Sequence, residues 1–268
     1  PTFAVTADAE GAVVNLFDEG VARLVLSDGT PVTVRTATRY PADGLVRVAL
    51  EVKAPKTFAL KLRVPAWCAD WSIEPKADAK LGSDGYLTVR RAWQSGDAVE
   101  LRLKLGPRLV LGDHLNQGKA ALCYGPLVLA ADESLMAGSG LSYNAAALAS
   151  PDLAALNVAP EPAPEGWRTW AGTQFFRVCA SNRRGSSQAR VGLVPFADAG
   201  ATGAKYKVWI PLPGKPSANV LLDGTESRSR PGNRNESIND DDRNTFAVTY
   251  DGKPAAEDWF GVTLDAPA

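Results

Sequence analysis

The acidic run near the carboxyl end of the chain is the first candidate for binding chemistry. Asp240, Asp242 and Asn244 stand at alternate positions in "NDDDRNT". A calcium loop begins with oxygen-bearing side chains at this spacing, and Asp251 falls where the twelfth-position ligand would be. Thr245, however, occupies the position where the turn of an EF-hand requires glycine. Two interpretations stay open: a structural calcium ion in a loop of another kind, and a solvated acidic turn, which such runs form more often.

A catalytic arrangement of the Ser/His/Asp or Cys/His kind would have to use His114, the single histidine of the chain. His114 lies in a Gly- and Asp-rich loop between two predicted strands. We expect a surface or loop-packing histidine there, and a histidine that lines a cleft is the alternative. Glycoside hydrolysis instead needs two carboxylates ~5–10 Å apart, and the 30 acidic residues do not single out a pair. The sequence therefore assigns no catalytic residue and no substrate-binding residue.

The cysteines do not form a recognisable metal or redox motif. Cys68, Cys123 and Cys179 lie far apart, and none belongs to a CxxC or Cys/His pair. An odd number of cysteines also argues against a complete disulfide framework. We therefore expect three small, mostly buried thiols.

Length, composition and charge restrict the class of protein. The 268 residues are 45% hydrophobic, which is enough for a core and for one to three domains. The formal charge of -1 gives no electrostatic reason to expect nucleic acid or an anionic membrane as a partner. No run of ~18 apolar residues is present, so no membrane-spanning segment is predicted. The cellular compartment cannot be read from the sequence.

Residues 13–105 repeat a period-two pattern that is typical of half-buried β-strands. The segments 46–52, 58–64, 86–93 and 98–105 alternate apolar with polar side chains. Within 58–64, the pattern places Leu62 on a buried face and Lys61 on a wet one. Turn signals such as Gly96-Asp97 separate the runs at spacings of roughly 8–15 residues. The pattern predicts an all-β fold built from jelly-roll-like sandwiches.

Three β domains are predicted. The first covers 1–112 as a jelly-roll-like sandwich, and the second covers 113–215 with an irregular insert. In that insert, 134–157 is Ala- and Ser-rich with weak helical character, and 159–167 is a Pro-rich connector. The third domain is expected at 216–268, where the composition turns polar and rich in turn residues.

Five segments of the chain carry recognisable motifs. They are "VVNLF" (13–17), "TRYPADGLVRVAL" (38–50), "LRVPAWC" (62–68), "GKAALCYGPLVLAAD" (118–132) and "LVPFADAGATGAKYKVWIPL" (193–212). In this order they resemble the C-terminal β region of the β-L-arabinofuranosidase-like glycoside hydrolases of family 127 and their family 146 relatives. "LRVPAWC", for instance, is similar to the hallmark "LRIPAW" of that family. The resemblance covers about 13–212.

The resemblance implies that the chemistry lies outside this chain. In that family a cysteine thiolate bound to zinc is the nucleophile, beside a second cysteine and a glutamate. These residues belong to an (α/α)6 helical barrel that precedes the β region. This chain has no adjacent Cys-Cys pair and no predicted barrel helices, so none of those roles can be assigned here. We therefore expect a fragment of a longer protein, with the missing barrel as its partner and zinc only in that barrel.

The tail resembles a second family. The segment "ESINDDDRNTFAV" (236–248) with "DWFGVTLDAP" (258–267) looks like the start of a discoidin-like module, a class that includes family 32 carbohydrate-binding modules. Phe246 stands where the usual pattern has tryptophan. Only about a third of such a module is present, so its sugar-binding loops are not assigned.

The favoured function is that of a non-catalytic accessory region in a family 127-type glycoside hydrolase. Such a region would pack on the catalytic barrel and assist in binding plant-type carbohydrate, and a periplasmic or secreted parent is one expectation. A stand-alone carbohydrate-binding or adhesion protein without an enzyme parent is the second hypothesis. A hydrolase that is complete within these residues is the third, and it is disfavoured because no nucleophile and base are visible together.

Overall fold

Strands dominate the computed structural model of the chain. It describes 3–75, 79–141, 143–144, 146–165, 167, 174–182, 187–213, 224–229, 256 and 259–264. Within these residues, helical structure is limited to α1 (Leu153–Leu156) and three short 3-10 turns. The predicted all-β fold without a helical barrel is therefore confirmed. In the described part of the chain, no helix is long and apolar enough to cross a membrane.

The chain divides into two compact units, Pro1–Gly106 and Pro107–Ala268. The first predicted boundary was residue 112, and the division falls earlier. The reason is that β11 (Pro107–Leu111) pairs antiparallel with β12 (Lys119–Tyr124) of the second unit. The predicted boundary near 215 lies among residues outside the described ranges, so a separate domain at 216–268 stays a prediction.

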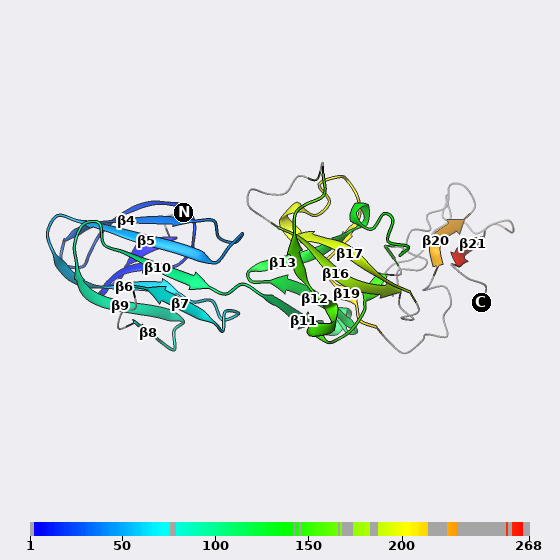
Figure 1. Ribbon diagram of the computed structural model, residues 1–268, viewed down its shortest axis with the longest axis horizontal. Coiled ribbons are helices and arrows are strands. Elements are labelled where there is room, and N and C mark those ends of the chain that lie inside the picture. The colour runs from blue at the N-terminus through cyan, green and yellow to red at the C-terminus, as the bar shows by residue number, and fades with distance from the viewer. Residues whose placement is uncertain are drawn as a thin grey trace. The chain divides into compact units, whose positions relative to one another are not determined.

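The first unit is a sandwich of two five-stranded sheets, here called sheet A and sheet B (Figure 1). Sheet A has the order β1 (Val5–Ala7), β2 (Gly11–Val14), β6 (Lys56–Arg63), β9 (Tyr86–Trp93) and β8 (Ala79–Leu81). Sheet B has the order β3 (Gly20–Val25), β4 (Pro31–Thr38), β5 (Leu45–Val52), β10 (Ala98–Leu103) and β7 (Trp71–Glu74). All pairs are antiparallel except β2 with β6. β1 stands at one end of the order of sheet A and β3 at one end of the order of sheet B, so each is an edge strand.

Alternation along each strand fills the space between the two sheets. Leu60 lies opposite Val89 and Leu62 opposite Leu87 across β6 and β9, and all four side chains are buried. From sheet B, the inward residues of β5 and β10 complete the same core: Val46, Val48, Leu50, Val52, Val99, Leu101 and Leu103. The periodicity of 46–52 and 58–64 thus predicted the buried face correctly. Leu105, predicted to continue the last strand, lies beyond its end at Leu103.

Lys61 departs from the predicted wet outer face of β6. Its side chain is only 15% exposed, and its Nζ donates to Asp8 Oδ2 over 2.8 Å and pairs with Glu10 as well. These hydrogen bonds, to Asp8 first and Glu10 second, raise the pKa of Lys61 well above its ordinary value. The Lys61 side chain is covered because the parallel pairing of β2 with β6 brings the β1–β2 turn over this part of β6.

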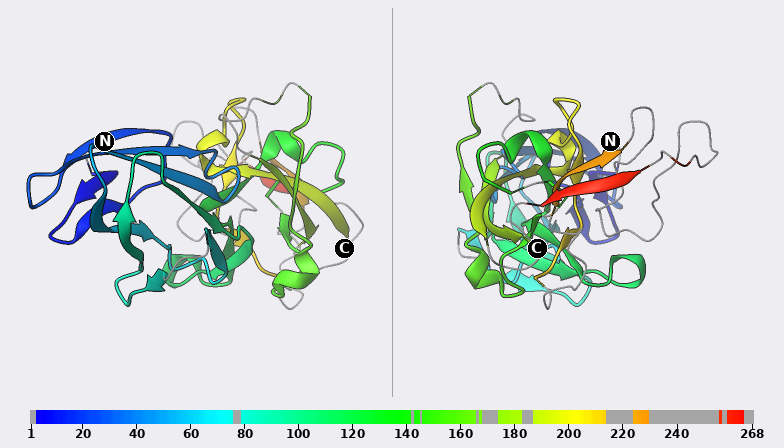
Figure 2. Two further views of the ribbon diagram at one scale, coloured as in Figure 1. Left: turned by 60° about the vertical axis from the view of Figure 1, so that its left-hand side comes forward. Right: turned by 90° about the vertical axis from the view of Figure 1, so that its right-hand side faces the viewer.

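The second unit contains one nine-stranded sheet. Its main path is β11, β12, β13 (Leu127–Asp132), β17 (Gln188–Pro195), β16 (Phe175–Asn182) and β14 (Ala146–Leu148). Three short strands add to it: β15 (Ala159–Glu161) pairs β16, β18 (Tyr206–Lys207) pairs β13, and β19 (Ile210–Pro211) pairs β12. Figure 2 shows β16 and β17 side by side as a long curved pair. This unit has its own core around Leu122, Leu129, Phe176 and Leu193.

Three segments differ from the sequence interpretation. The expected helical character of 134–157 is confined to a 3-10 turn and to α1, because Ala146–Leu148 pairs with β16 as β14. The Pro-rich connector at 159–167 begins with strand β15, where Pro160 lies opposite Phe176. The polar stretch after 223 contains β20 (Gly224–Ser229), which pairs with β21 (Phe260–Leu264). Orange and red in Figure 2 mark these two strands.

Candidate docking surface

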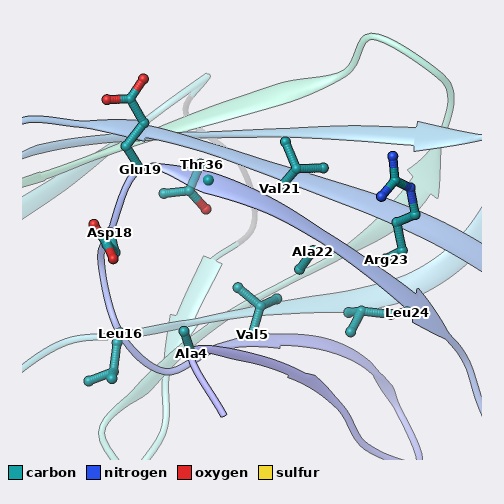
Figure 3. Close-up of a pocket in the computed structure, with 11 residues that line it drawn as sticks. Ala4, Val5, Leu16, Asp18, Glu19, Val21, Ala22, Arg23, Leu24 and Thr36 are labelled. Atoms are coloured by element: carbon teal, nitrogen blue, oxygen red, sulfur yellow. The ribbon is translucent and has the colours of Figure 1, made fainter. Parts of the chain in front are cut away.

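A hollow of about 540 Å³ lies along the open edge of the first unit, between β1 and β3. We call it the β1–β3 groove; its walls are Ala4 and Val5 on one side and 20–24 on the other, with Leu16, Asp18 and Glu19 at the connection (Figure 3). Each of the two strands pairs on one side only, β1 with β2 and β3 with β4. Edge strands present backbone N–H and C=O groups that can pair with another segment. The groove therefore offers both apolar side chains and strand edges.

The floor of the groove is the rim of the sandwich core. Val5, Ala22 and Leu24 are half-buried and pack against that core. Val21, in contrast, is 49% exposed, and Leu16 is exposed as well. The outward side of β3 thus carries apolar surface that the first unit leaves uncovered. Exposed apolar surface next to a core edge is typical of an interaction site.

Charged side chains lie at opposite ends of the groove. Asp18 and Glu19 stand at the end near the β2–β3 connection, and Arg23 stands toward the other end (Figure 3). A segment that fits the groove would therefore be apolar along its length, with a cation near Asp18 and an anion near Arg23. Such opposed charges fix the direction of a bound segment. Apolar walls and two strand edges are features that suit the binding of another segment.

A second hollow of about 420 Å³ lies on the outer face of sheet B. Glu100 lies opposite both Arg47 and Glu74 in the register, and its carboxylate accepts hydrogen bonds from Arg47 at 3.0 Å and Arg102 at 3.3 Å. The guanidinium of Arg91, 3.5 Å from Asp97, adds to this charged surface. Arg47 and Arg102 are exposed, whereas Glu100, Arg91 and Asp97 are half-buried, and we interpret these ion pairs as part of a largely solvated face of the sheet.

The structure describes some of the predicted site residues and not others. Asp240, Asp242 and Asn244, the calcium candidates, lie outside the described residues. His114 sits in a 3-10 turn with its side chain 89% exposed, and its nearest charged partner is Asp113 at 3.3 Å. The expectation of a surface histidine is confirmed. Among the residues that the structure covers, no group of three His, Cys, Asp or Glu side chains could hold a metal ion.

The surroundings of Cys68 and Cys123 do not favour a reactive thiolate. All three are free, with Cys68 and Cys123 buried and Cys179 half-buried. Burial raises the pKa of the Cys68 and Cys123 thiols, which disfavours the reactive thiolate. The expectation of small, mostly buried thiols is therefore confirmed.

Sequence reasoning missed the β1–β3 groove. Its signal was present in "GVARLV" (20–25), where Ala22 and Leu24 alternate with Val21, Arg23 and Val25. The inward side of this run is weakly apolar and its outward side mixes valines with a charge. This pattern is typical of an edge strand whose outward residues are apolar.

The first unit matches a known family model. Residues 11–105 match the model of the middle domain of the GH127 β-L-arabinofuranosidases. The resemblance predicted from the motifs is thereby confirmed over most of the first unit. No curated protein sequence matches the chain. The discoidin-like resemblance of the tail stays a prediction.

Solved structures share the fold over both units. A GH127 β-L-arabinofuranosidase from Geobacillus stearothermophilus T6 superposes with a TM-score of 0.67 at 22% identity, covering 78% of this chain and 35% of that one. A structure described as a glycoside hydrolase gives 0.67 at 21%, with 78% and 37% covered. A GH127 β-arabinofuranosidase gives 0.59 at 22%, with 75% and 34% covered. The chain thus spans about a third of the length of these proteins.

Proposed function

We propose that the chain is the non-catalytic accessory β region of a GH127-type arabinofuranosidase and works beside a catalytic domain. The match of 11–105 to the GH127 middle domain carries this proposal. A further observation supports it: the solved relatives are about three times as long as this chain. Zinc, in this proposal, belongs to the catalytic domain. A structural calcium ion at Asp240, Asp242 and Asn244 remains a separate proposal.

The β1–β3 groove is the surface that we assign to the catalytic domain. Its uncovered apolar residues need a partner, and a helical barrel presents amphipathic helices of the matching kind. Ala4 and Val5 form one wall, so a domain joined before them would be tethered beside the groove. In this role the chain would form part of the support of the substrate cleft and assist in carbohydrate binding.

A complementation experiment tests the proposal. The catalytic domain of the parent protein is produced alone and mixed with this chain, and release of 4-nitrophenol from its β-L-arabinofuranoside is followed together with the melting temperature of the catalytic domain. We expect the chain to raise both. Val21→Asp, in the groove, should abolish the gain. Val25→Asp is the matched control, because Val25 is on the same strand and is exposed, yet it does not line the groove.

Two results would contradict the proposal. If the chain fails to associate with any catalytic domain encoded beside it, the stand-alone carbohydrate-binding hypothesis replaces it. If the chain associates and both valine variants still support the catalytic domain, the accessory role survives and the groove is the wrong surface.

A further inference from the structure

Two aromatic side chains stand together on the surface of the second unit. Phe196 is 52% exposed and Tyr206 is 46% exposed. Their ring centroids lie 5.9 Å apart with an angle of 61° between the ring planes. Large aromatic side chains are normally buried because each removes 150–250 Å² of surface from water. A contacting pair that stays half exposed is therefore a candidate interaction site.

The backbone holds this pair in a defined position. Tyr206 begins β18 and lies opposite Asp132 at the end of β13, while Phe196 follows directly after β17, which pairs β13 on its other side. Asp132 is fully buried, and its Oδ2 accepts a hydrogen bond of 2.8 Å from the N–H of Gly200. Gly200 in turn leaves room for the ring, because a Cβ there would lie only 2.8 Å from a Tyr206 ring carbon. The loop and the two strands thus place the pair before any ligand arrives.

The surroundings of the pair indicate the class of ligand. The residues that join the two rings, 197–205, are "ADAGATGAK", which contains no aliphatic side chain larger than alanine. A protein interface would surround its aromatic residues with further apolar contacts that exclude water. Along this loop the residues are small or polar, with Lys205 exposed, and after Tyr206 the Lys207 ammonium lies 4.6 Å from the centre of the Tyr143 ring and donates to the Tyr143 carbonyl oxygen at 2.6 Å. Rings on a polar, open loop suit a ligand that is itself apolar on one face and polar at its rim.

We propose that Phe196 and Tyr206 form a binding platform for the sugar rings of a polysaccharide. The C–H face of a sugar ring packs against an aromatic ring, and its hydroxyl groups stay at the rim for water. This inference rests on the proposed function for its choice of carbohydrate. It names the site through which the accessory region would hold a glycan.

The test measures glycan binding by the whole chain. Wild type is run in native gels that contain soluble plant arabinan or arabinogalactan, with dextran as a comparison glycan. We expect arabinan or arabinogalactan to retard it. The Phe196→Leu/Tyr206→Leu double variant keeps apolar side chains but lacks the rings, and we expect its affinity to fall about tenfold or more, as for a lost stacking contact. Leu111→Ala is the matched control, since Leu111 is an exposed apolar residue of the same unit whose loss should leave retardation unchanged.

Three outcomes overturn the inference. They are no retardation of wild type in any glycan gel, equal retardation of wild type and the leucine variant, and an equal loss for Leu111→Ala. Circular dichroism of the double variant confirms that it is folded.

The complementation assay with the catalytic domain separates this inference from the proposed function. If the double variant binds no glycan but still supports the catalytic domain, both proposals stand, and if wild type supports the domain without binding glycan, the platform alone is refuted.

Discussion

Leu62 and Thr57 lie on the same strand, β6, yet a carboxylate should have a different effect at each. Leu62 is fully buried against the inward face of β9, so Leu62→Asp would bury an unpaired charge. That should cost several kcal/mol of a typical total of ~5–15 kcal/mol, and we expect the first unit to unfold. Thr57→Asp, an exposed position on the same strand, is the control. Equal melting temperatures of the two variants would show that the register of β6 is wrong.

Lys61→Asp is not a suitable control for Leu62→Asp. The Lys61 ammonium lies between the carboxylates of Asp8 and Glu10, so Lys61→Asp would gather three like charges. The predicted wet position of Lys61 would suggest a small cost for this change, whereas its ion pairs with Asp8 and Glu10 predict a larger one. The correction came from long-range pairing: the residues that surround Lys61 belong to the β1–β2 turn, far away in the sequence.

The same cluster predicts a dependence of stability on pH. Burial alone would raise the pKa of Asp8, but hydrogen bonds from Lys61 and from the Glu10 and Gly11 N–H groups outweigh it and lower the pKa below 3.8. A lowered pKa contributes stability that is present above the unfolded value and lost as the pH falls through the folded one. We expect Lys61→Met to cost about 1–2 kcal/mol at neutral pH. The difference from wild type should shrink below about pH 4.

Urea unfolding at several pH values measures this effect. Lys104→Met is the control, because Lys104 pairs with Asp70 at 2.9 Å on the surface and should change the unfolding free energy little. A gap between wild type and Lys61→Met that stays constant down to pH ~2 would contradict the assigned role of Asp8.

At the scale of elements, Gly44 allows the β4–β5 connection to lie flat against the end of β10. A Cβ at Gly44 would be 1.8 Å from the carbonyl oxygen of Leu103, whose N–H donates to Gly44 O at 2.9 Å. We expect Gly44→Ala to destabilise the first unit by about 1–3 kcal/mol, the usual cost of overpacking. Gly20→Ala, with no atom within 4 Å of its Cβ position, should be nearly neutral. Thermal melting of both variants checks this, and a neutral Gly44→Ala would mean that the contact is looser.

Sequence periodicity predicted where individual strands lie better than it predicted which strands pair. The runs at 46–52 and 58–64 were predicted with the correct buried face, because each lies in the middle of a sheet and alternates cleanly. β15 was missed because Pro160 is tolerated on an edge strand and reads as a connector. The parallel pairing of β2 with β6 depends on contacts across the whole sandwich, which no local pattern encodes. The groove between β1 and β3 was missed for the same reason, since it exists only once two edge strands meet.

For the whole molecule, two separate hydrophobic cores predict two unfolding transitions. One core is built from residues of Pro1–Gly106 and the other from residues of Pro107–Ala268. Calorimetry should resolve two events, and Leu62→Asp should remove one and leave the other. A reducing agent should shift neither, because all three cysteines are free. A single transition that Leu62→Asp abolishes completely would show that the units unfold together.

The chain alone should have no glycosidase activity. Among the described residues no group of three His, Cys, Asp or Glu side chains could hold a metal ion, and the exposed His114 pairs with Asp113. Release of 4-nitrophenol from the β-L-arabinofuranoside by the purified chain is the measurement. Turnover at the ordinary enzymatic rate of ~1–10³ s⁻¹ would refute the accessory role.

The parallel pairing of β2 with β6 also has a consequence during synthesis. Gly11 lies opposite Ala59 and Val14 opposite Leu62, so the partner of β2 leaves the ribosome only after β3, β4 and β5. At a synthesis rate of ~5–20 residues per second, β2 waits roughly 2–10 seconds with Ala12 and Val14 uncovered. β3, β4 and β5 can meanwhile pair with their chain neighbours. During this interval β2 has β1 as its only sheet partner.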